Sequence, residues 1–237
     1  MGRIGDSPRV AAADTPGDCP RICRFEPWLG WRWPPEASSS LSRMARIKLR
    51  SRRDVNERIR ALAGPLTTAL RALPGRADDP AVIDAVWQAE GLGMLLWALG
   101  LVELPPYDSL FDAEWLLATP TAHGNLRARA EIEHARESAR LWHWRARTHA
   151  LRRGDEIDLP DTWDSFEQLI AVAAMRGYEQ GLLPSPTRGD FAAFGKGYRE
   201  LSATEAADAF SIAYERHRAL NWVCGEGRTW EETPTDT

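Results

Sequence analysis

The sequence is poor in cysteine and almost without lysine. Its 237 residues include three cysteines, and 28 of the 30 basic side chains are arginine. Three cysteines cannot build a disulfide framework, which indicates a reducing compartment. The only lysines are Lys48 and Lys196. Together with the alanine-rich segments, this skew is typical of codon bias in a GC-rich genome rather than of a phosphate-binding site.

No apolar run in the sequence is long enough to cross a bilayer. The longest, residues 92–102, has about half of the roughly 20 residues that a membrane-spanning helix requires. The N-terminus lacks the charged start and apolar stretch of a secretory signal. The net charge of −4 provides no basic field that would attract nucleic acid or an anionic membrane. We therefore predict a cytosolic protein without membrane partners.

The motifs of several enzyme classes are also missing. The sequence has no glycine-rich phosphate loop, serine nucleophile elbow or kinase signature. Glu131 and His134 form one Glu-x-x-His step, whereas a carboxylate-bridged di-metal bundle needs two. Cys19 and Cys23 lack further cysteine or histidine ligands nearby, which argues against zinc. We expect neither a metal site nor a cofactor.

Arginines gather in two places, but neither predicts nucleic-acid binding. One group precedes residue 54, and the other, Arg145, Arg147, Arg152 and Arg153, ends a long predicted helix. Cations near a helix C-terminus are favoured by the helix dipole, which partly explains the second group. No recognised nucleic-acid motif accompanies them, and the chain is acidic overall. Binding of nucleic acid is therefore disfavoured.

Residues 1–43 differ from the rest of the chain. They contain six prolines, a run of three serines and no sustained helical period. Such a segment cannot bury enough apolar surface to offset the entropy of ordering it. Two interpretations are open for its three tryptophans: an extraneous stretch upstream of a start at Met44, or an arm that docks on a partner. We predict a disordered or extraneous extension, followed by one helical domain over residues 44–237.

Apolar residues recur at helical intervals from residue 54 onward. The clearest helix begins at the cap Asp79 and Pro80 and ends before Gly100. The last helix begins at a capping box formed by Ser202 and Glu205. The first expected helix begins near residue 54 and has a kink or break at Gly64–Pro65. The other expected helices span about 80–99, 109–118, 125–153, 162–181 and 202–224. Asp161 or Thr162 is expected to cap the helix over 162–181.

These patterns predict an all-α fold, a single irregular or orthogonal bundle of about six helices. A long loop rich in proline and glycine, residues 182–201, precedes the last helix. The later half of the helix over 80–99 is apolar almost all round, which is typical of a buried helix. We expect this helix and the one over 202–224 to be central. The tryptophans expected near the core are Trp87, Trp97, Trp142 and Trp222.

Glu90 is the carboxylate in the most apolar setting. It lies on the same face as Trp97 in the helix over 80–99, so we expect it to be buried. Burial raises the pKa of a carboxyl group unless a cation or hydrogen bonds hold it ionised. Glu90 could act as a general acid or base in a pocket beneath Trp87 and Trp97. Alternatively, it pairs with an arginine of the long helix or of the last one, which we favour.

His217 and Asn221 form a second polar cluster. They lie one turn apart on the last helix and can touch. A nucleophilic site with Cys224 is excluded, because His217 and Cys224 are two turns apart on one helix, about 10 Å by the helical rise. A satisfied core histidine is therefore the favoured interpretation.

Three segments, residues 87–100, 141–144 and 215–222, resemble the bacterial domain-of-unknown-function family DUF4272. They read WQAEGLGMLLWALG, LWHW and ERHRALNW. The closing residues 230–237 also resemble the usual chain end of that family. The resemblance extends over roughly residues 49–237 and implies a helical domain without a known activity.

Two functions are compatible with these patterns. The leading hypothesis is a non-enzymatic interaction or small-ligand-binding domain whose protein partner or ligand is unknown. The alternative is a small hydrolase-like enzyme that uses Glu90 with His217, which requires the two within about 4 Å across an open, polar-lined pocket. A binding module would instead have a closed core around Glu90 and His217 and an exposed apolar patch elsewhere on its surface. The candidate catalytic residues are Glu90, His217 and Asn221, and the candidate ligand contacts are Trp87, Trp97 and Arg216.

Overall fold

The structure is a computed structural model that describes residues 48–76, 78–151 and 163–237. This part of the chain contains six α-helices, which confirms the predicted all-α class, and one small hairpin. The interpretation of residues 1–43 lies outside the described residues. The elements are α2 (Arg52–Arg76), α3 (Pro80–Ala98), α4 (Ala113–Ala118), α5 (Arg129–Leu151), α6 (Phe166–Glu179), the antiparallel strands β1 (Ala192–Ala193) and β2 (Lys196–Gly197), a 3₁₀ turn (Tyr198–Glu200) and α7 (Ala203–Val223).

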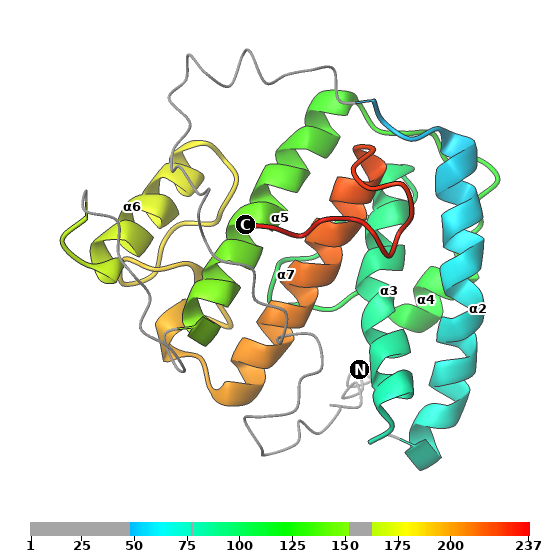
Figure 1. The fold of residues 1–237 in the computed structure, drawn as a ribbon, viewed down its shortest axis with the longest axis horizontal. Coiled ribbons are helices and arrows are strands. Elements are labelled where there is room, and N and C mark those ends of the chain that lie inside the picture. The colour runs from blue at the N-terminus through cyan, green and yellow to red at the C-terminus, as the bar shows by residue number, and fades with distance from the viewer. Residues whose placement is uncertain (1–47, 77, 152–162) are drawn as a thin grey trace, which may run out of the picture.

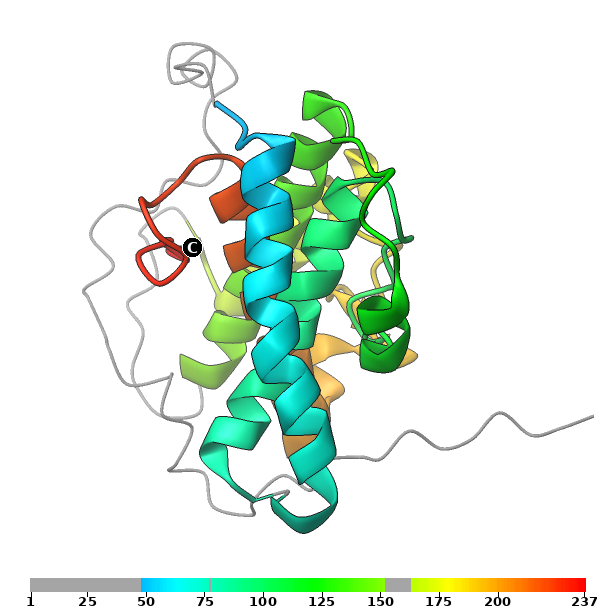
Figure 2. The same ribbon diagram turned by 90° about the vertical axis from the view of Figure 1, so that its right-hand side faces the viewer.

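Helices α3 and α7 lie at the centre of the bundle (Figure 1). Helix α2 packs along α3, and α5 packs along α7 on the other side. Helix α6 and the hairpin segment lie beyond α5, and α4 and the C-terminal segment lie on opposite sides of the α2–α3 pair (Figure 2). Residues 89–99 are all buried, as expected for a helix that is apolar on every face. None of the described helices is long and apolar enough to cross a membrane.

Helix ends follow the local capping signals closely. Asp79 accepts from the backbone N–H of Ala81, and Ser202 and Glu205 form the predicted capping box. Helix α6 begins later than predicted, with Ser165 as its cap, and the predicted caps at 161 and 162 lie outside the described residues. Helix α4 is also shorter than predicted, because Asp112 accepts from the backbone N–H of Trp115 and sets its start.

Of the kink or break predicted at Gly64–Pro65, the break is wrong, because α2 continues through this point to Arg76. A proline removes one backbone donor and crowds the preceding turn, which disfavours a helix interior. Here Leu62, Leu66 and Ala69 keep one buried face on both sides of the proline. Packing of that face against α3 therefore maintains the helix.

Small residues allow three close approaches inside the bundle. A seam of small residues on α5 is buried and brings Ala135, Ala139 and Ala146 against the core. A Cβ atom on Gly93 would lie 2.3 Å from the Phe111 ring, so the segment before α4 packs directly on the α3 backbone. Gly177 of α6 makes the same kind of contact with the loop that follows it. These contacts fix two loops, residues 101–112 and 180–202, on the helical frame.

Candidate functional site

Glu90 is paired with an arginine of the last helix. Arg216 Nε donates to Glu90 Oε2 at 2.8 Å, and the backbone N–H of Phe111 donates to Glu90 Oε1 at 2.8 Å. Both charged side chains are buried, with 2% or less of their surface exposed. Burial raises the pKa of Glu90, while the Arg216 charge and the Phe111 N–H oppose that shift. The ion-pair interpretation of Glu90 is the one that the structure shows.

The remaining donors of Arg216 hold the segment before α4. Its Nη1 donates to the carbonyls of Pro105 and Pro106, and its Nη2 donates to the carbonyl of Ser109, at 2.7–3.1 Å. The guanidinium also lies 4.8 Å from the Tyr107 ring centroid, within the range of a cation–π contact. Arg216 is fully buried, so its donors position the chain rather than face solvent.

A second buried pair, Arg145 with Asp190, holds the loop that precedes α7. The guanidinium donates two parallel hydrogen bonds of 2.8 Å to the carboxylate, and both side chains are 2% exposed. The backbone N–H groups of Phe191 and Arg199 complete the coordination of Asp190. Burial opposes ionisation, but these donors and the Arg145 charge hold the pKa of Asp190 below its ordinary value. Arg145 lies near the end of α5, as expected, but its charge is buried and paired with Asp190.

A pocket lies between the two segments that these pairs hold. Its volume is about 300 Å³. The Tyr107 and Trp142 rings stack at 5.2 Å, and Trp142 packs edge-on against Phe191. Asp108 Oδ2 accepts from the backbone N–H of Phe194 at 2.8 Å, which ties the two segments together. The lining residues are Pro106, Tyr107, Asp108, Ser138, Trp142, Leu182, Pro184 and Ala192.

The Tyr107 hydroxyl is the unusual group of this pocket. It is buried, and the described residues offer it no hydrogen-bond partner of acceptable geometry. The neighbouring Ser138 donates its own proton to the carbonyl of Leu182 at 2.7 Å. Burial raises the pKa of Tyr107 well above its ordinary value, and Arg216 and Ser138 only partly offset this. Tyr107 is therefore a neutral phenol with an unused donor, and a buried unused donor costs about 1–3 kcal/mol.

His217 meets a second histidine, His143 of α5, in a buried contact. The two Nδ1 atoms are 3.1 Å apart, and both rings are almost fully buried. Burial, followed by the charges of Arg136, Arg140 and Arg147, lowers the pKa of His217 to about 3. Burial, the partner histidine and Arg147 also hold the pKa of His143 well below its ordinary value. Both rings are neutral at pH 7, in agreement with the interpretation of His217 as a satisfied core histidine.

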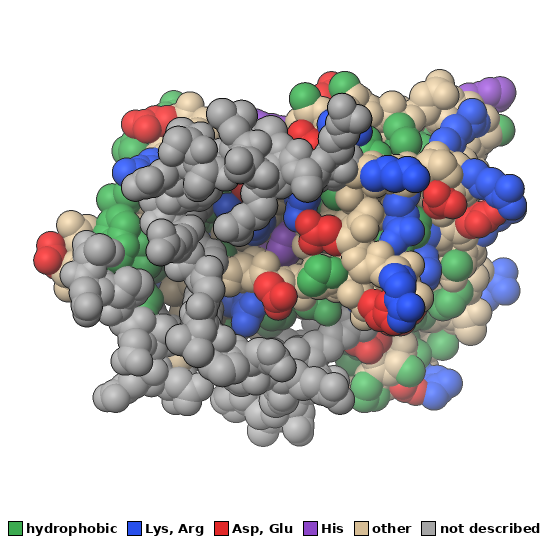
Figure 3. Space-filling model, turned by 45° about the horizontal axis from the view of Figure 1, so that its top comes forward, with side chains coloured by type: hydrophobic (Ala, Val, Ile, Leu, Met, Phe, Trp, Pro, Cys, Tyr) green, Lys and Arg blue, Asp and Glu red, His purple; other side chains and the backbone are tan. Residues whose placement is uncertain are grey.

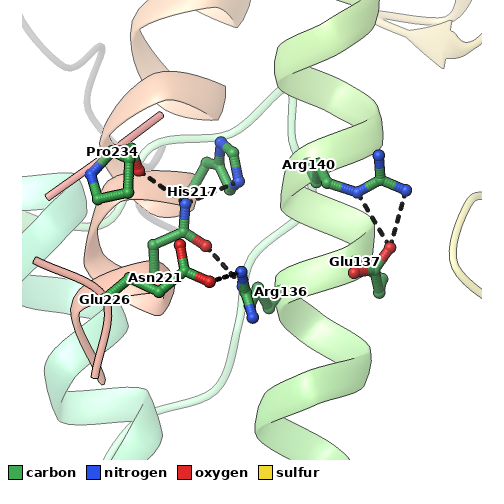
Figure 4. Close-up of polar contacts among 7 residues, drawn as sticks. All are labelled: Arg136, Glu137, Arg140, His217, Asn221, Glu226 and Pro234. Atoms are coloured by element: carbon green, nitrogen blue, oxygen red, sulfur yellow. Dashed lines mark hydrogen bonds and ion pairs between the residues drawn. The ribbon is translucent and has the colours of Figure 1, made fainter. Parts of the chain in front are cut away.

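Asn221 connects this histidine pair to the C-terminal segment (Figure 4). Its Nδ2 lies 3.0 Å from His217 Nε2 and donates to the carbonyl of Pro234 at 2.8 Å. Its Oδ1 accepts from Arg136 Nε at 2.6 Å, and Arg136 also pairs with Glu226. Both polar atoms of the Asn221 side chain therefore form hydrogen bonds.

The structure separates the candidate catalytic residues into two clusters. Glu90 binds Arg216 and Phe111, whereas His217 binds His143 and Asn221, and among the described residues no hydrogen bond or ion pair joins Glu90 to His217. The candidate ligand contacts Trp97 and Arg216 are buried, and Trp87 packs partly buried against the core. None of them is among the residues that line the pocket.

Charges on the face drawn in Figure 3 are mixed rather than gathered by sign. Basic and acidic side chains lie beside one another over α2, where Arg53 pairs with Glu57 and Arg58 approaches Glu231. In the described ranges, no three histidine, cysteine or acidic side chains come together as a metal site would require. The Tyr107–Trp142 pocket, in contrast, brings aromatic and polar side chains together.

The histidine pair makes the stability of the protein dependent on pH. Unfolded histidine has a pKa near 6.5, whereas that of folded His217 is about 3, so below pH 6.5 the unfolded state binds more protons. The contribution of His217 to the free energy of unfolding is therefore fully present above pH 6.5 and decreases as the pH falls toward 3. We expect the free energy of unfolding to decrease by about 2 kcal/mol between pH 7.5 and 5 from His217 alone.

Urea unfolding at pH 5, 6 and 7.5 measures this decrease. The variant H134Q is the matched control, because His134 is an exposed histidine of α5, the helix that carries His143, and its replacement removes a histidine without altering the buried pair. In H217Q the decrease between pH 7.5 and 5 should become smaller. A wild-type free energy of unfolding that is constant over this range would contradict a neutral buried pair.

Several residues of the pocket and of the clusters carry no signal in the sequence. Tyr107, Ser138 and Asp190 lie in segments or on helix faces without a distinctive pattern. His143 is visible in the LWHW segment, but its partner lies 74 residues away. No protein-family model, curated protein or solved structure matches the chain in the comparisons with known proteins.

Proposed function

We propose that this chain is a non-enzymatic, small-ligand-binding domain whose ligand occupies the Tyr107–Trp142 pocket. The observation that carries the proposal is that Tyr107 lines the pocket and that its buried hydroxyl has no hydrogen-bond partner among the described residues. Binding pockets are typically apolar and aromatic hollows with a few polar groups that orient the ligand. This pocket fits that description, and the Arg216 and Arg145 pairs hold its walls.

The pocket volume limits the size of the ligand. A water molecule occupies about 30 Å³ of liquid, so 300 Å³ accommodates a molecule of about ten non-hydrogen atoms. A pocket of this volume is at the lower end of the range for small-molecule sites. We therefore expect a metabolite or fragment of the size of one substituted ring.

The polar groups define the chemistry of the ligand. Tyr107 requires a hydrogen-bond acceptor, whereas Ser138 already donates to Leu182. Asp108 is the one charged residue that lines the pocket, and its carboxylate disfavours an anion. The ligand class that fits is a small neutral molecule, flat and mostly apolar, with one acceptor oxygen or nitrogen.

The hydrolase alternative has less geometric support. Glu90 and His217 do not share a pocket, since the first is held by Arg216 and the second by His143 and Asn221. The side chains that surround each of them are buried. A hydrolytic site would need an open space between an acid or base and the reacting bond.

Acetophenone is a suitable probe because it is neutral, planar and of the expected size, with one acceptor oxygen. Its isostere α-methylstyrene lacks the acceptor, and benzoate adds a negative charge. We expect ligand-observed NMR titrations to rank acetophenone above both. Replacement of Tyr107 by Phe should weaken acetophenone binding about threefold to tenfold, the equivalent of one neutral hydrogen bond, and leave α-methylstyrene unaffected.

Tyr198 provides the matched control. Its hydroxyl is also buried without a partner among the described residues, and an arginine, Arg145, lies 4.6 Å from its ring centroid. However, Tyr198 does not line the pocket. The variant Y198F should therefore bind acetophenone like the wild type. Equal binding of acetophenone and α-methylstyrene, or equal effects of Y107F and Y198F, would refute the proposal.

A further inference from the structure

The C-terminal segment, residues 226–237, lies across α7 and the face of α5 (Figure 1). Trp230 is buried and packs at 3.1 Å from the Cβ position of Gly91 on α3. Beyond Trp230, the segment forms polar contacts with α7 and α5. Asn221 donates to the carbonyl of Pro234, and Arg147 Nη1 donates to the Thr237 hydroxyl at 3.4 Å. The Asn221 bond is therefore a polar anchor that holds residues 233–237 on α7.

The orientation of the Asn221 amide is fixed by its neighbours. Arg136 Nε is a donor and must face the amide oxygen, whereas the Pro234 carbonyl is an acceptor and must face the amide nitrogen. In this orientation the amide nitrogen also donates to His217 Nε2. That nitrogen of His217 must therefore be unprotonated.

The same logic assigns the proton between the two histidines. Because His217 is neutral and unprotonated at Nε2, its proton lies on Nδ1 and is donated to His143 Nδ1. A second proton on His217 can bind only at Nε2. An N–H of Asn221 already points at this nitrogen, so the two hydrogens would clash. An added proton on His143 Nδ1 would face the N–H of His217. Protonation of either ring is therefore incompatible with the observed contacts.

A rotated Asn221 amide cannot accommodate a protonated His217. After rotation its oxygen would accept from His217 Nε2, but its nitrogen would face Arg136 Nε, and its oxygen would face the Pro234 carbonyl. One new hydrogen bond would be gained and two would be lost. The Asn221 amide thus links the protonation of His217 to the attachment of Pro234.

Charged groups around His217 set the electrostatic field at its ring. From α5 it meets His143 and the charges of Arg136, Arg140 and Arg147. The carboxylate of Glu226 is paired with Arg136, and Asp236 acts on Arg147. On α3, the buried Glu90 is neutralised by Arg216 of α7. The net field at His217 is positive, which adds to the cost of a proton there.

We propose that the His143–His217 pair and Asn221 form a pH-sensitive latch, in which protonation of His217 releases residues 233–237 from α7. Docked and released states then differ in proton affinity. Because only the docked state holds an N–H of Asn221 against Nε2 of His217, the ratio of released to docked segment rises as the pH falls from 7.5 to 5. The released segment would uncover the face of α5 that carries Arg136 and Arg147.

Selective ¹⁵N-threonine labelling provides a direct test on the full chain. Thr233, Thr235 and Thr237 report on the latch, and Thr148, buried in α5, reports on the bundle. Between pH 7.5 and 5 we expect the amide shifts of the three tail threonines to move toward random-coil values and their heteronuclear NOE to fall. The Thr148 signal should remain unchanged. Ring ¹⁵N shifts should show His217 protonated at Nδ1 and His143 at Nε2 at pH 7.5.

Two results would overturn the latch. One is a tail whose signals do not change while the ring of His217 becomes protonated. The other is a tail that is released only together with a change at Thr148, because release would then reflect unfolding of the bundle. In H217Q the pH response of the tail should disappear, and in the control H134Q it should persist. If H217Q does not fold, the wild-type titration with its Thr148 reference still decides between these outcomes.

Discussion

Substitution of Glu90 by Gln is expected to lower the free energy of unfolding by about 3–5 kcal/mol, the range for breaking a buried ion pair. The neutral amide would leave the Arg216 charge buried without a counterion, since the other partners of Arg216 are carbonyl oxygens. Chemical unfolding of the variant and the wild type at pH 7.5 measures the difference.

An exposed ion pair serves as the control for this substitution. Glu57 pairs with Arg53 on the surface of α2, so E57Q should leave the free energy of unfolding close to that of the wild type. A double-mutant cycle with R216M separates the pair from its surroundings. The costs of E90Q and R216M should be strongly non-additive. Additive costs, or an E90Q variant as stable as E57Q, would show that the two side chains are not coupled.

Substitution of Asp190 by Asn is expected to have an effect of the same size, about 3–5 kcal/mol. Asp190 accepts two hydrogen bonds from Arg145 and two from backbone N–H groups. An asparagine can accept through one atom only, so Arg145 would keep a buried charge that is no longer neutralised. The hairpin segment, which forms one wall of the pocket, would lose its main polar contact with α5.

The local part of this effect is measurable by hydrogen exchange. The Tyr198 amide donates to the carbonyl of Phe191 at 2.9 Å, and its exchange should accelerate in D190N more than that of amides in α3. The control is E200Q in the same loop, since Glu200 pairs with the exposed Arg188. D190N should also abolish acetophenone binding. An unchanged Tyr198 amide in a destabilised D190N variant would show that Asp190 does not hold the hairpin.

The helical frame could be predicted because its signals are local. Asp79, Ser202 and Glu205 satisfy backbone donors within three residues, so their spacing alone marks the helix starts. The course of α2 through Pro65 could not be predicted in this way. It depends on contacts with α3, which no pattern within α2 reveals.

The polar clusters could be predicted only in part. The apolar setting of Glu90 indicates burial, and the structure shows it buried. Its partner lies 126 residues away and is one of 28 arginines, so the pattern could not select Arg216. Arg145 looks like an ordinary helix-end cation in the sequence, because Asp190 approaches it only once the loop before α7 is folded.

The pocket itself has no signature in the sequence. Tyr107 follows two prolines in a segment without helical or strand periodicity. Ser138 and Trp142 lie one turn apart on α5, and the remaining wall comes from residues 182–192. Three segments meet there because Arg216 and Arg145 hold two of them against the helices. The candidate site is thus a product of tertiary packing.

A difference electron-density map from a crystal soaked in acetophenone would show directly whether the pocket binds this ligand. We expect density in the space lined by Tyr107, Ser138 and Trp142, with the carbonyl oxygen within hydrogen-bonding distance of the Tyr107 hydroxyl. This density should be absent from Y107F crystals soaked at a limiting concentration, at which weaker binding leaves the pocket largely unoccupied. Density at another place, or a pocket filled by protein side chains in the crystal, would contradict binding at this pocket.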